Sequence, residues 1–279
     1  MKQRAISAVL FVLAMLGGVF GGAIPFFLLF GLITGGCLWE LGGILFGKEN
    51  EYVTLRRVLA TALGMMPYLV YGGIKTGLFN VKGGTESLLP GLVAVVMVVV
   101  FLLILLELFL ASAQPFTNVG HYLTGLAYVS IPFAMFLGIA HWDDQYTPLR
   151  VIGLLSLNWA NDTFAYLVGS QIGKTPFFSR ISPKKTWEGT IGGMVCTFLA
   201  AWLLSHYIPS FSFGQWMALA ACVAVFGTLG DLVESMLKRS VNIKDSGAIL
   251  PGHGGFLDRF DSFIFIQPFV WLIFWLQTS

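Results

Sequence analysis

The sequence predicts an all-α, polytopic integral membrane protein with about nine transmembrane helices and a cytoplasmic N-terminus. Of its 279 residues, 56% are hydrophobic and only 11% are charged, whereas soluble domains carry about 25% charged residues. Apolar windows near the length that crosses a bilayer, about 20 residues, recur along the whole chain. Lysine and arginine gather in alternate connections between these windows.

Each apolar window predicts one helix, because a helix satisfies its own backbone hydrogen bonds inside lipid. Gly21, Gly22 and Pro25 divide the first long apolar stretch, which is too long for a single span. The windows are residues 5–20, 24–46, 56–73, 87–111, 119–140, 148–170, 189–207, 213–237 and 260–278. The first window also fits a signal peptide, but it lacks a clear cleavage site followed by polar sequence, so we expect an uncleaved helix.

The basic residues predict the orientation. Of the 16 lysines and arginines, all but Lys75, Lys82 and Arg150 fall in connections on the same side as the N-terminus. By the positive-inside rule that side is the cytoplasm. The polar connections are too short to fold alone, so we predict a single membrane-embedded domain over 1–279. Residues 1–147 are then mainly a helical scaffold, and 148–279 carry the catalytic helices and cytoplasmic loops.

Composition excludes several classes of function. The net charge of +2 gives no reason to expect nucleic-acid binding. Cys37, Cys196 and Cys222 lie in apolar runs without paired spacing, which argues against disulfides and a zinc site.

Five acids fall in the cytoplasmic halves of predicted helices. Helix ends tolerate long charged side chains that reach water, but Asp and Glu are short, so we expect a polar cavity open to the cytoplasm. The five are Glu40, Glu107, Asp162, Asp231 and Glu234.

The segment from Ser235 to Ser262 concentrates charge between two apolar windows. Asp231, Glu234, Ser235 and Lys238 are spaced to share one helix face; the alternative to a functional site is an ion-pair ladder. Asp258 and Asp261 share a face at the start of the last window. With Asp231 they suggest a Mg²⁺ site, although the helix dipole also favours an aspartate there.

Basic residues and glycines in the same segment predict phosphate binding. Lys238, Arg239 and Lys244 precede the turn 252–255, and glycine lets backbone N–H groups approach an anion. A second polar cluster is SPKKTWEG, for which attraction to anionic lipid is the alternative. It contributes Ser182, Lys184, Lys185, Thr186 and Glu188. Asn158, Asn161 and Asp162 are expected to line the cavity.

The run S-M-L-K-R, K-D-S-G and L-P-G-H-G-G-F-L-D-R-F-D resembles the signature of the phosphatidate cytidylyltransferases, or CDP-diacylglycerol synthases. N-D-T-F-A-Y and S-P-K-K-T-W-E-G also resemble that family, so the resemblance covers about the last 120 residues. It implies a magnesium-dependent nucleotidyltransferase of phospholipid biosynthesis. CTP and phosphatidate would give CDP-diacylglycerol and pyrophosphate.

The resemblance and the residue patterns together assign the site. Phosphatidate is largely a dianion at neutral pH, so no strong base is needed, and His253 is expected to donate a hydrogen bond to phosphate. The catalytic set is Lys238, Arg239, Lys244, Asp245, His253 and Arg259. The substrate-binding set is Asn161, Asp162, Ser182, Lys184, Lys185, Thr186, Ser235, Gly254 and Gly255. The metal set is Asp231, Asp258 and Asp261, for Mg²⁺ with room for a second ion.

Several alternatives stay open. The acceptor lipid could be an isoprenoid-ether analogue of phosphatidate, because tail selection is weak per methylene. An ion-coupled transporter would also carry intramembrane acids, but near the midplane between repeats. We expect a bacterial inner membrane location with the site facing the cytoplasm and membrane lipid around it. A homodimer is compatible with the sequence, which does not reveal the oligomeric state.

Overall fold

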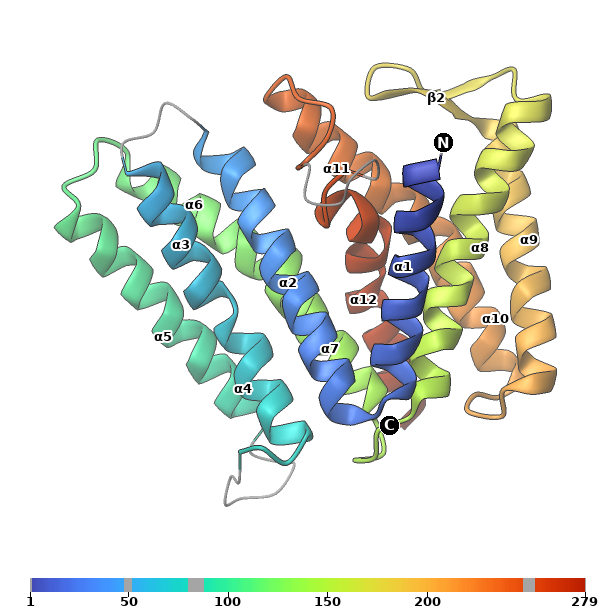
Figure 1. Ribbon diagram of the computed structural model, residues 1–279, viewed down its shortest axis with the longest axis horizontal. Helices are drawn as coiled ribbons and strands as arrows, with labels where there is room; N and C mark the ends of the chain where they lie inside the picture. Colours follow the sequence, from blue (N-terminus) through green and yellow to red (C-terminus); the bar gives the residue numbers. More distant parts are fainter. Residues whose placement is uncertain (1, 48–51, 80–87, 248–253, 279) are drawn as a thin grey trace. The chain divides into compact units, whose positions relative to one another are not determined.

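The computed structural model of the chain describes residues 2–47, 52–79, 88–247 and 254–278 (Figure 1). The chain is mostly helical and divides into two compact units. The first comprises Met1–Tyr146 and Asp245–Asp258, and the second comprises Thr147–Lys244 and Arg259–Ser279. The end of the charged segment therefore belongs with the N-terminal helices. The predicted division into scaffold and catalytic halves stays a prediction.

The first unit is a bundle of helices around α2 (Ala23–Phe46). Its other helical elements are α1 (Lys2–Phe20), α3 (Val53–Gly64), α4 (Met66–Lys75), α5 (Leu88–Phe109), α6 (Pro115–Gly125), the π-helical turn η2 (Leu126–Ser130) and α7 (Ile131–Ala140). Phe26 and Phe30 on α2 pack edge-on against Phe136 on α7. The predicted break after the first helix is confirmed, because Gly22 has φ of +110° and turns the chain from α1 into α2.

The second unit is built on α8 (Pro148–Ile172) and α9 (Trp187–Tyr207), which run side by side (Figure 1). Glycines allow this close approach: a Cβ on Gly193 would lie 2.8 Å from the Asn161 carbonyl oxygen. The unit continues with α10 (Phe213–Cys222), the π-helical turn η3 (Val223–Gly227), α11 (Thr228–Ser240) and α12 (Leu257–Thr278), of which Arg259 onward belongs here.

One correction to the all-α prediction lies between α8 and α9. Strands β1 (Pro176–Phe178) and β2 (Ser182–Thr186) pair antiparallel there. Pro176 and Pro183 disfavour a helix interior. The Glu188 carboxylate accepts hydrogen bonds from the backbone N–H groups of Lys174 and Thr175, and this closes the base of the hairpin.

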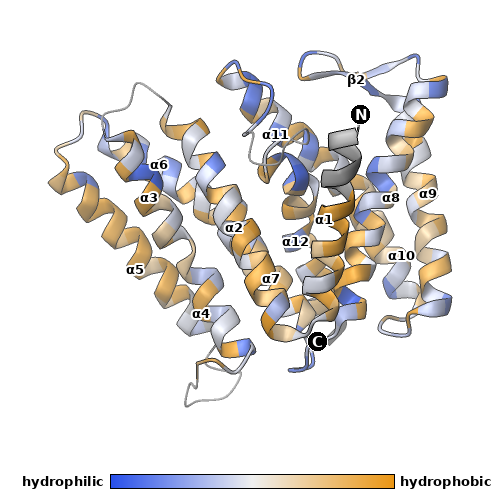
Figure 2. Cartoon of the chain, in the orientation of Figure 1, coloured by the Kyte–Doolittle hydropathy of each residue, from blue (hydrophilic) through white to orange (hydrophobic). Residues whose placement is uncertain are grey.

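A polytopic membrane protein is confirmed. Each predicted window coincides with a helical segment in the part of the chain that the structure describes. Six of these segments are long and apolar enough to cross a membrane: Ala23–Phe46, Val53–Lys75, Pro115–Ala140, Trp187–Tyr207, Phe213–Ser240 and Leu257–Leu276. Figure 2 shows α5 and α9 as largely hydrophobic and the β2 hairpin as hydrophilic. The count of nine spans and the cytoplasmic N-terminus remain predictions.

Candidate active site

A cavity of about 510 Å³ lies in the second unit. This volume falls within the roughly 300–1,000 Å³ that is typical of small-molecule sites. The cavity is lined by Asn161, Asp162, Ala165, Tyr166, Gly169, Ser170, Lys184, Lys185, Thr186, Thr190, Thr228 and Asp231. Six of these residues were predicted from the sequence as substrate-binding or metal-binding. The structure thus brings N-D-T-F-A-Y, S-P-K-K-T-W-E-G and the start of α11 together.

Asn161 ties three helices together at the cavity. Its side chain is 1% exposed, and its amide nitrogen donates to Thr228 Oγ1 at 3.4 Å. Its amide oxygen accepts from Thr197 Oγ1 on α9, also at 3.4 Å. Asp162 follows on α8 and receives a hydrogen bond from Asn158 at 3.2 Å. Asn161 therefore has a structural role beside its place in the lining.

An ion pair crosses the cavity between the hairpin and α11. Lys185 Nζ lies 2.5 Å from Asp231 Oδ2, with the two side chains 25% and 33% exposed. Ser235, one turn along α11, donates to Asp231 Oδ1 at 3.3 Å. Thr186 ends β2 and caps α9, accepting a hydrogen bond from the Gly189 N–H. These contacts fix the hairpin lysines relative to the acids of α11. Ser182, at the start of β2, is not among the lining residues.

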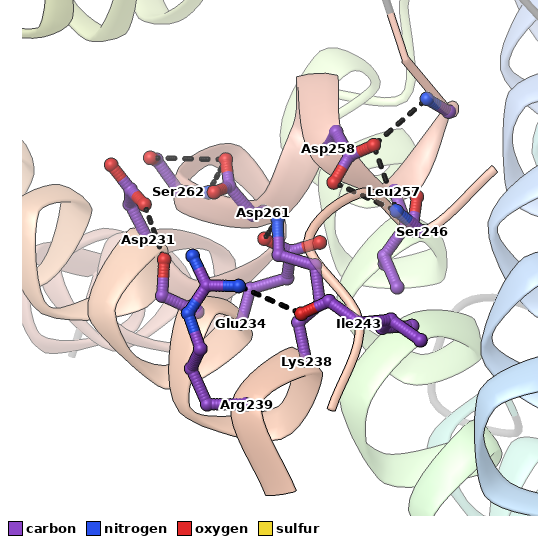
Figure 3. Close-up of polar contacts among 12 residues, drawn as sticks. Asp231, Glu234, Lys238, Arg239, Ile243, Ser246, Leu257, Asp258, Asp261 and Ser262 are labelled. Atoms are coloured by element: carbon purple, nitrogen blue, oxygen red, sulfur yellow. Dashed lines mark hydrogen bonds and ion pairs between the residues drawn. The ribbon is translucent and has the colours of Figure 1, made fainter. Parts of the chain in front are cut away.

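Four carboxylates of the second unit interact electrostatically. Asp261 on α12 lies close enough to Asp231, Glu234 and Asp162 for their negative charges to repel its own. Glu234 is completely buried and pairs with Lys238, which lies one turn later on the same helix face. Figure 3 shows the side chains of Asp231, Glu234 and Asp261 in one neighbourhood, with Asp261 bonded to Ser262.

The donor chemistry of this cluster fits a hard cation, because Mg²⁺ prefers carboxylate oxygens. Within the described residues, no three acidic, histidine or cysteine side chains are arranged to enclose a metal ion. That is compatible with Mg²⁺, which is commonly bound by one or two carboxylates together with substrate phosphates and waters. Of the three predicted metal ligands, Asp231 and Asp261 lie in this unit, and their assignment stays a prediction.

Three of the predicted phosphate-binding cations in the second unit are exposed. Arg239 is exposed at the end of α11, and its guanidinium donates to the Ile243 carbonyl oxygen at 2.7 Å (Figure 3). Lys244 and Arg259 are also exposed. Three predicted phosphate-binding cations can therefore be reached from outside, whereas Lys238 is buried against Glu234.

The other predicted residues belong to the first unit. Asp258 accepts hydrogen bonds from the backbone N–H groups of Ser246, at 3.0 Å, and Gly255, at 2.8 Å (Figure 3). Its assignment as a metal ligand stays a prediction. Gly254 has φ of +82°, a conformation that other residues adopt only with strain. Asp245 is exposed, and His253 lies outside the described residues.

The five helical acids do not all line one cavity. Asp162 and Asp231 do, but the expectation is wrong for Glu107, which is 1% exposed in the first unit. Glu107 accepts hydrogen bonds from Arg56, Asn118 and Tyr122. It neutralises a buried arginine, a pairing that the sequence did not reveal because the two residues are 51 positions apart.

Sequence comparisons agree with the signature. The cytidylyltransferase family matches residues 2–277. A phosphatidate cytidylyltransferase of Bacillus subtilis (strain 168) is 34% identical over 275 residues, covering 98% of this chain and 97% of that protein. One of Staphylococcus aureus (strain COL) is 42% identical over 155 residues, or 55% of this chain and 58% of that one. One of Staphylococcus haemolyticus (strain JCSC1435) is 40% identical over 155 residues, with the same two shares.

Proposed function

The chain belongs to the cytidylyltransferase family, and we propose that it works as a magnesium-dependent phosphatidate cytidylyltransferase facing the cytoplasm from a bacterial inner membrane. As a nucleotidyltransferase of this family, it transfers CMP from CTP to phosphatidate and forms CDP-diacylglycerol and pyrophosphate. The observation that carries the proposed site is the cavity of the second unit, where two lysines and two aspartates from separate elements face one space.

The reaction needs positioning and charge neutralisation more than a base. Phosphatidate is a phosphate monoester with a second pKa of about 6, so at neutral pH it is largely a dianion. One of its oxygens attacks the α-phosphorus of CTP and forms a new P–O bond. The bond from that phosphorus to the β-phosphate oxygen breaks, and pyrophosphate leaves with its electron pair. No proton has to be removed from the attacking group.

Lys184, Lys185 and Thr186 are placed to bind phosphate oxygens. They stand on β2 and line the cavity, and Lys185 already pairs with a carboxylate. A phosphate entering the cavity offers Lys185 a second anionic partner, and charge-assisted hydrogen bonds are the stronger kind. Arg239 on α11, Lys244 after it and Arg259 on α12 add exposed positive charge in the same unit. His253 is proposed as a further hydrogen-bond donor.

Asp231 and Asp261 would hold Mg²⁺, with Asp258 as the third proposed ligand and Asp245 as a further one. When bound, the ion would neutralise phosphate charge and stabilise the departing pyrophosphate. The closeness of Asp261 to Asp231, Glu234 and Asp162 supports this assignment, because like charges held together favour a cation.

The location of the cavity suits a reaction between a lipid and a nucleotide. The acyl chains must stay in lipid, and CTP arrives from water. On α8, Tyr166 is an exposed aromatic residue of the cavity lining, and Leu167, outside the lining, is exposed as well. Such exposed apolar side chains on the helix that bears Asp162 offer the lipid tails a place to pack.

A nucleotide panel tests this function. Detergent-purified protein receives phosphatidate with CTP, UTP, GTP or dATP, in magnesium or in chelator, and pyrophosphate release is measured. We expect release with CTP in magnesium and its loss in chelator. Equal release with all four nucleotides, or release that chelator does not reduce, would contradict the proposal.

A further inference from the structure

Glu40 is a buried carboxylate that the proposed reaction does not use. It stands on α2, is 3% exposed, and accepts three hydrogen bonds from residues more than 200 positions away. Ser246 Oγ donates at 2.8 Å, the Phe256 N–H at 3.1 Å and the Leu257 N–H at 2.9 Å. One side chain of the first unit therefore holds both described ends of the segment Asp245–Asp258.

The donors explain why a charged residue is stable there. The first N–H groups of a helix have no partner within the helix, and α12 begins at Leu257. Glu40 satisfies two N–H groups at this N-terminus, where the helix dipole also favours negative charge. A buried carboxylate without such donors would be costly.

Asp258 is a second carboxylate that accepts hydrogen bonds from the same segment. Its carboxylate binds the N–H groups of Ser246 and Gly255, so Ser246 is held through its hydroxyl by Glu40 and through its backbone by Asp258. Both carboxylates, of Glu40 and of Asp258, therefore bind Ser246. A shift of Glu40 would move Ser246 and with it a group that orients Asp258.

Two glycines make room for this arrangement. A Cβ on Gly247 would lie 2.5 Å from Glu40 Oε1, and a Cβ on Gly255 would collide with the same carboxylate. A Cβ at either position would displace the Glu40 carboxylate from its present place beside the backbone. Glycine at both positions therefore leaves the space in which Glu40 reaches the described ends of the segment, 245–247 and 254–258.

We propose that Glu40 is a positioning residue for the transfer reaction, setting the conformation of residues 245–247 and 254–258 and thereby the orientation of Asp258 and the Gly255 N–H. The inference rests on the proposed function, because it treats this segment as part of the reaction site. Glu40 acts through Ser246, Phe256 and Leu257 and does not touch substrate.

The test compares three variants of the full-length protein in detergent. Glu40→Gln keeps the shape but presents an NH₂ group to donors, and Glu40→Asp keeps the charge with a shorter reach. Thr34→Val is the control, because it removes another buried polar group from α2, one that donates only to the Phe30 carbonyl oxygen. Turnover, the thermal midpoint and hydrogen exchange of a peptide covering 254–258 are measured for each.

We expect Glu40→Gln to lower kcat about 100-fold, the cost of a displacement of about 1 Å in a reaction site. Hydrogen exchange should rise at 254–258 and not in α3 to α6, while the thermal midpoint stays near that of Thr34→Val. Glu40→Asp should recover part of kcat. Unchanged kcat in Glu40→Gln, or lost kcat with unchanged exchange at 254–258, would overturn the proposal, as would a rise in exchange across the whole first unit.

This design separates the two claims. If the wild-type protein forms no nucleotide-linked lipid, the proposed function fails while the exchange measurement still reports whether Glu40 holds the segment. If wild type is active and the Glu40 variants match it, only the positioning role fails.

Discussion

Replacement of Lys185 by alanine separates the structural from the catalytic role of the cavity. Lys185 pairs with Asp231 at 2.5 Å, but both side chains are partly exposed, at 25% and 33%. A pair of this kind contributes only about 0–1 kcal/mol to stability. Lys185→Ala should therefore shift the thermal midpoint little.

The effect on turnover should be much larger. In the proposed site Lys185 donates to a substrate phosphate, and a hydrogen bond involving a charged group contributes about 1.5–3 kcal/mol. That free energy corresponds to a loss of roughly 10- to 140-fold in kcat/KM. The measurement is steady-state pyrophosphate release over CTP and phosphatidate concentrations, beside a thermal melt of the same sample.

Lys174→Ala is the matched control. Lys174 is an exposed lysine in the same connection between α8 and α9, and it is not among the cavity-lining residues. It should keep nearly wild-type kcat/KM. If both alanine variants lose the same fraction of kcat/KM, or if Lys185→Ala loses none, the cavity is not where the phosphates bind.

Three further changes test other parts of the structure. Glu107→Leu leaves Arg56 buried without its carboxylate and should cost about 3–5 kcal/mol of unfolding free energy; denaturant unfolding measures it, and a loss under 1 kcal/mol would show that the pair is not buried. Asp261→Asn should raise the Mg²⁺ concentration for half-maximal turnover about tenfold or more, and an unchanged magnesium titration would remove Asp261 from the metal site. Arg239→Ala should raise the Michaelis constant for a substrate without lowering the thermal midpoint, because the guanidinium is exposed and its hydrogen bond goes to the carbonyl of Ile243, only four residues away; unchanged constants for both substrates would contradict its role in phosphate binding.

Sequence reasoning succeeded where the pattern is local. The apolar windows predicted the helical segments, because hydrophobicity over about 20 residues is set by the thickness of the bilayer. On α11 the pairing of Glu234 with Lys238 agrees with the ion-pair ladder that was the alternative to a functional site on that helix face. Asn161 and Asp162 on α8 line the cavity as expected, but Asn158 does not: it is buried one turn earlier on the helix and donates to Asp162.

Contacts between distant parts of the chain could not be read in this way. Glu40 and Glu107 look alike in the sequence, each an acid in an apolar run. Glu107 pairs with Arg56, whereas Glu40 binds Ser246, Phe256 and Leu257. Which partner an intramembrane acid finds depends on the packing of helices, and no periodicity encodes it. The hairpin was missed because its strands are only 3 and 5 residues long. A strand is recognised in a sequence by alternating apolar and polar residues, and runs of about 4–8 residues are needed for that alternation to be clear.

The fate of the α-phosphate of CTP tests the central claim most directly. Purified protein is given phosphatidate, magnesium and CTP labelled either at the α- or at the γ-phosphate, and the lipid and aqueous phases are counted. The account predicts that α-label enters the lipid phase in equal amount to the pyrophosphate released, and that γ-label leaves as pyrophosphate. Label from the γ-position in the lipid would indicate a kinase, and α-label remaining in water as CMP would indicate hydrolysis; either result would contradict CMP transfer to phosphatidate.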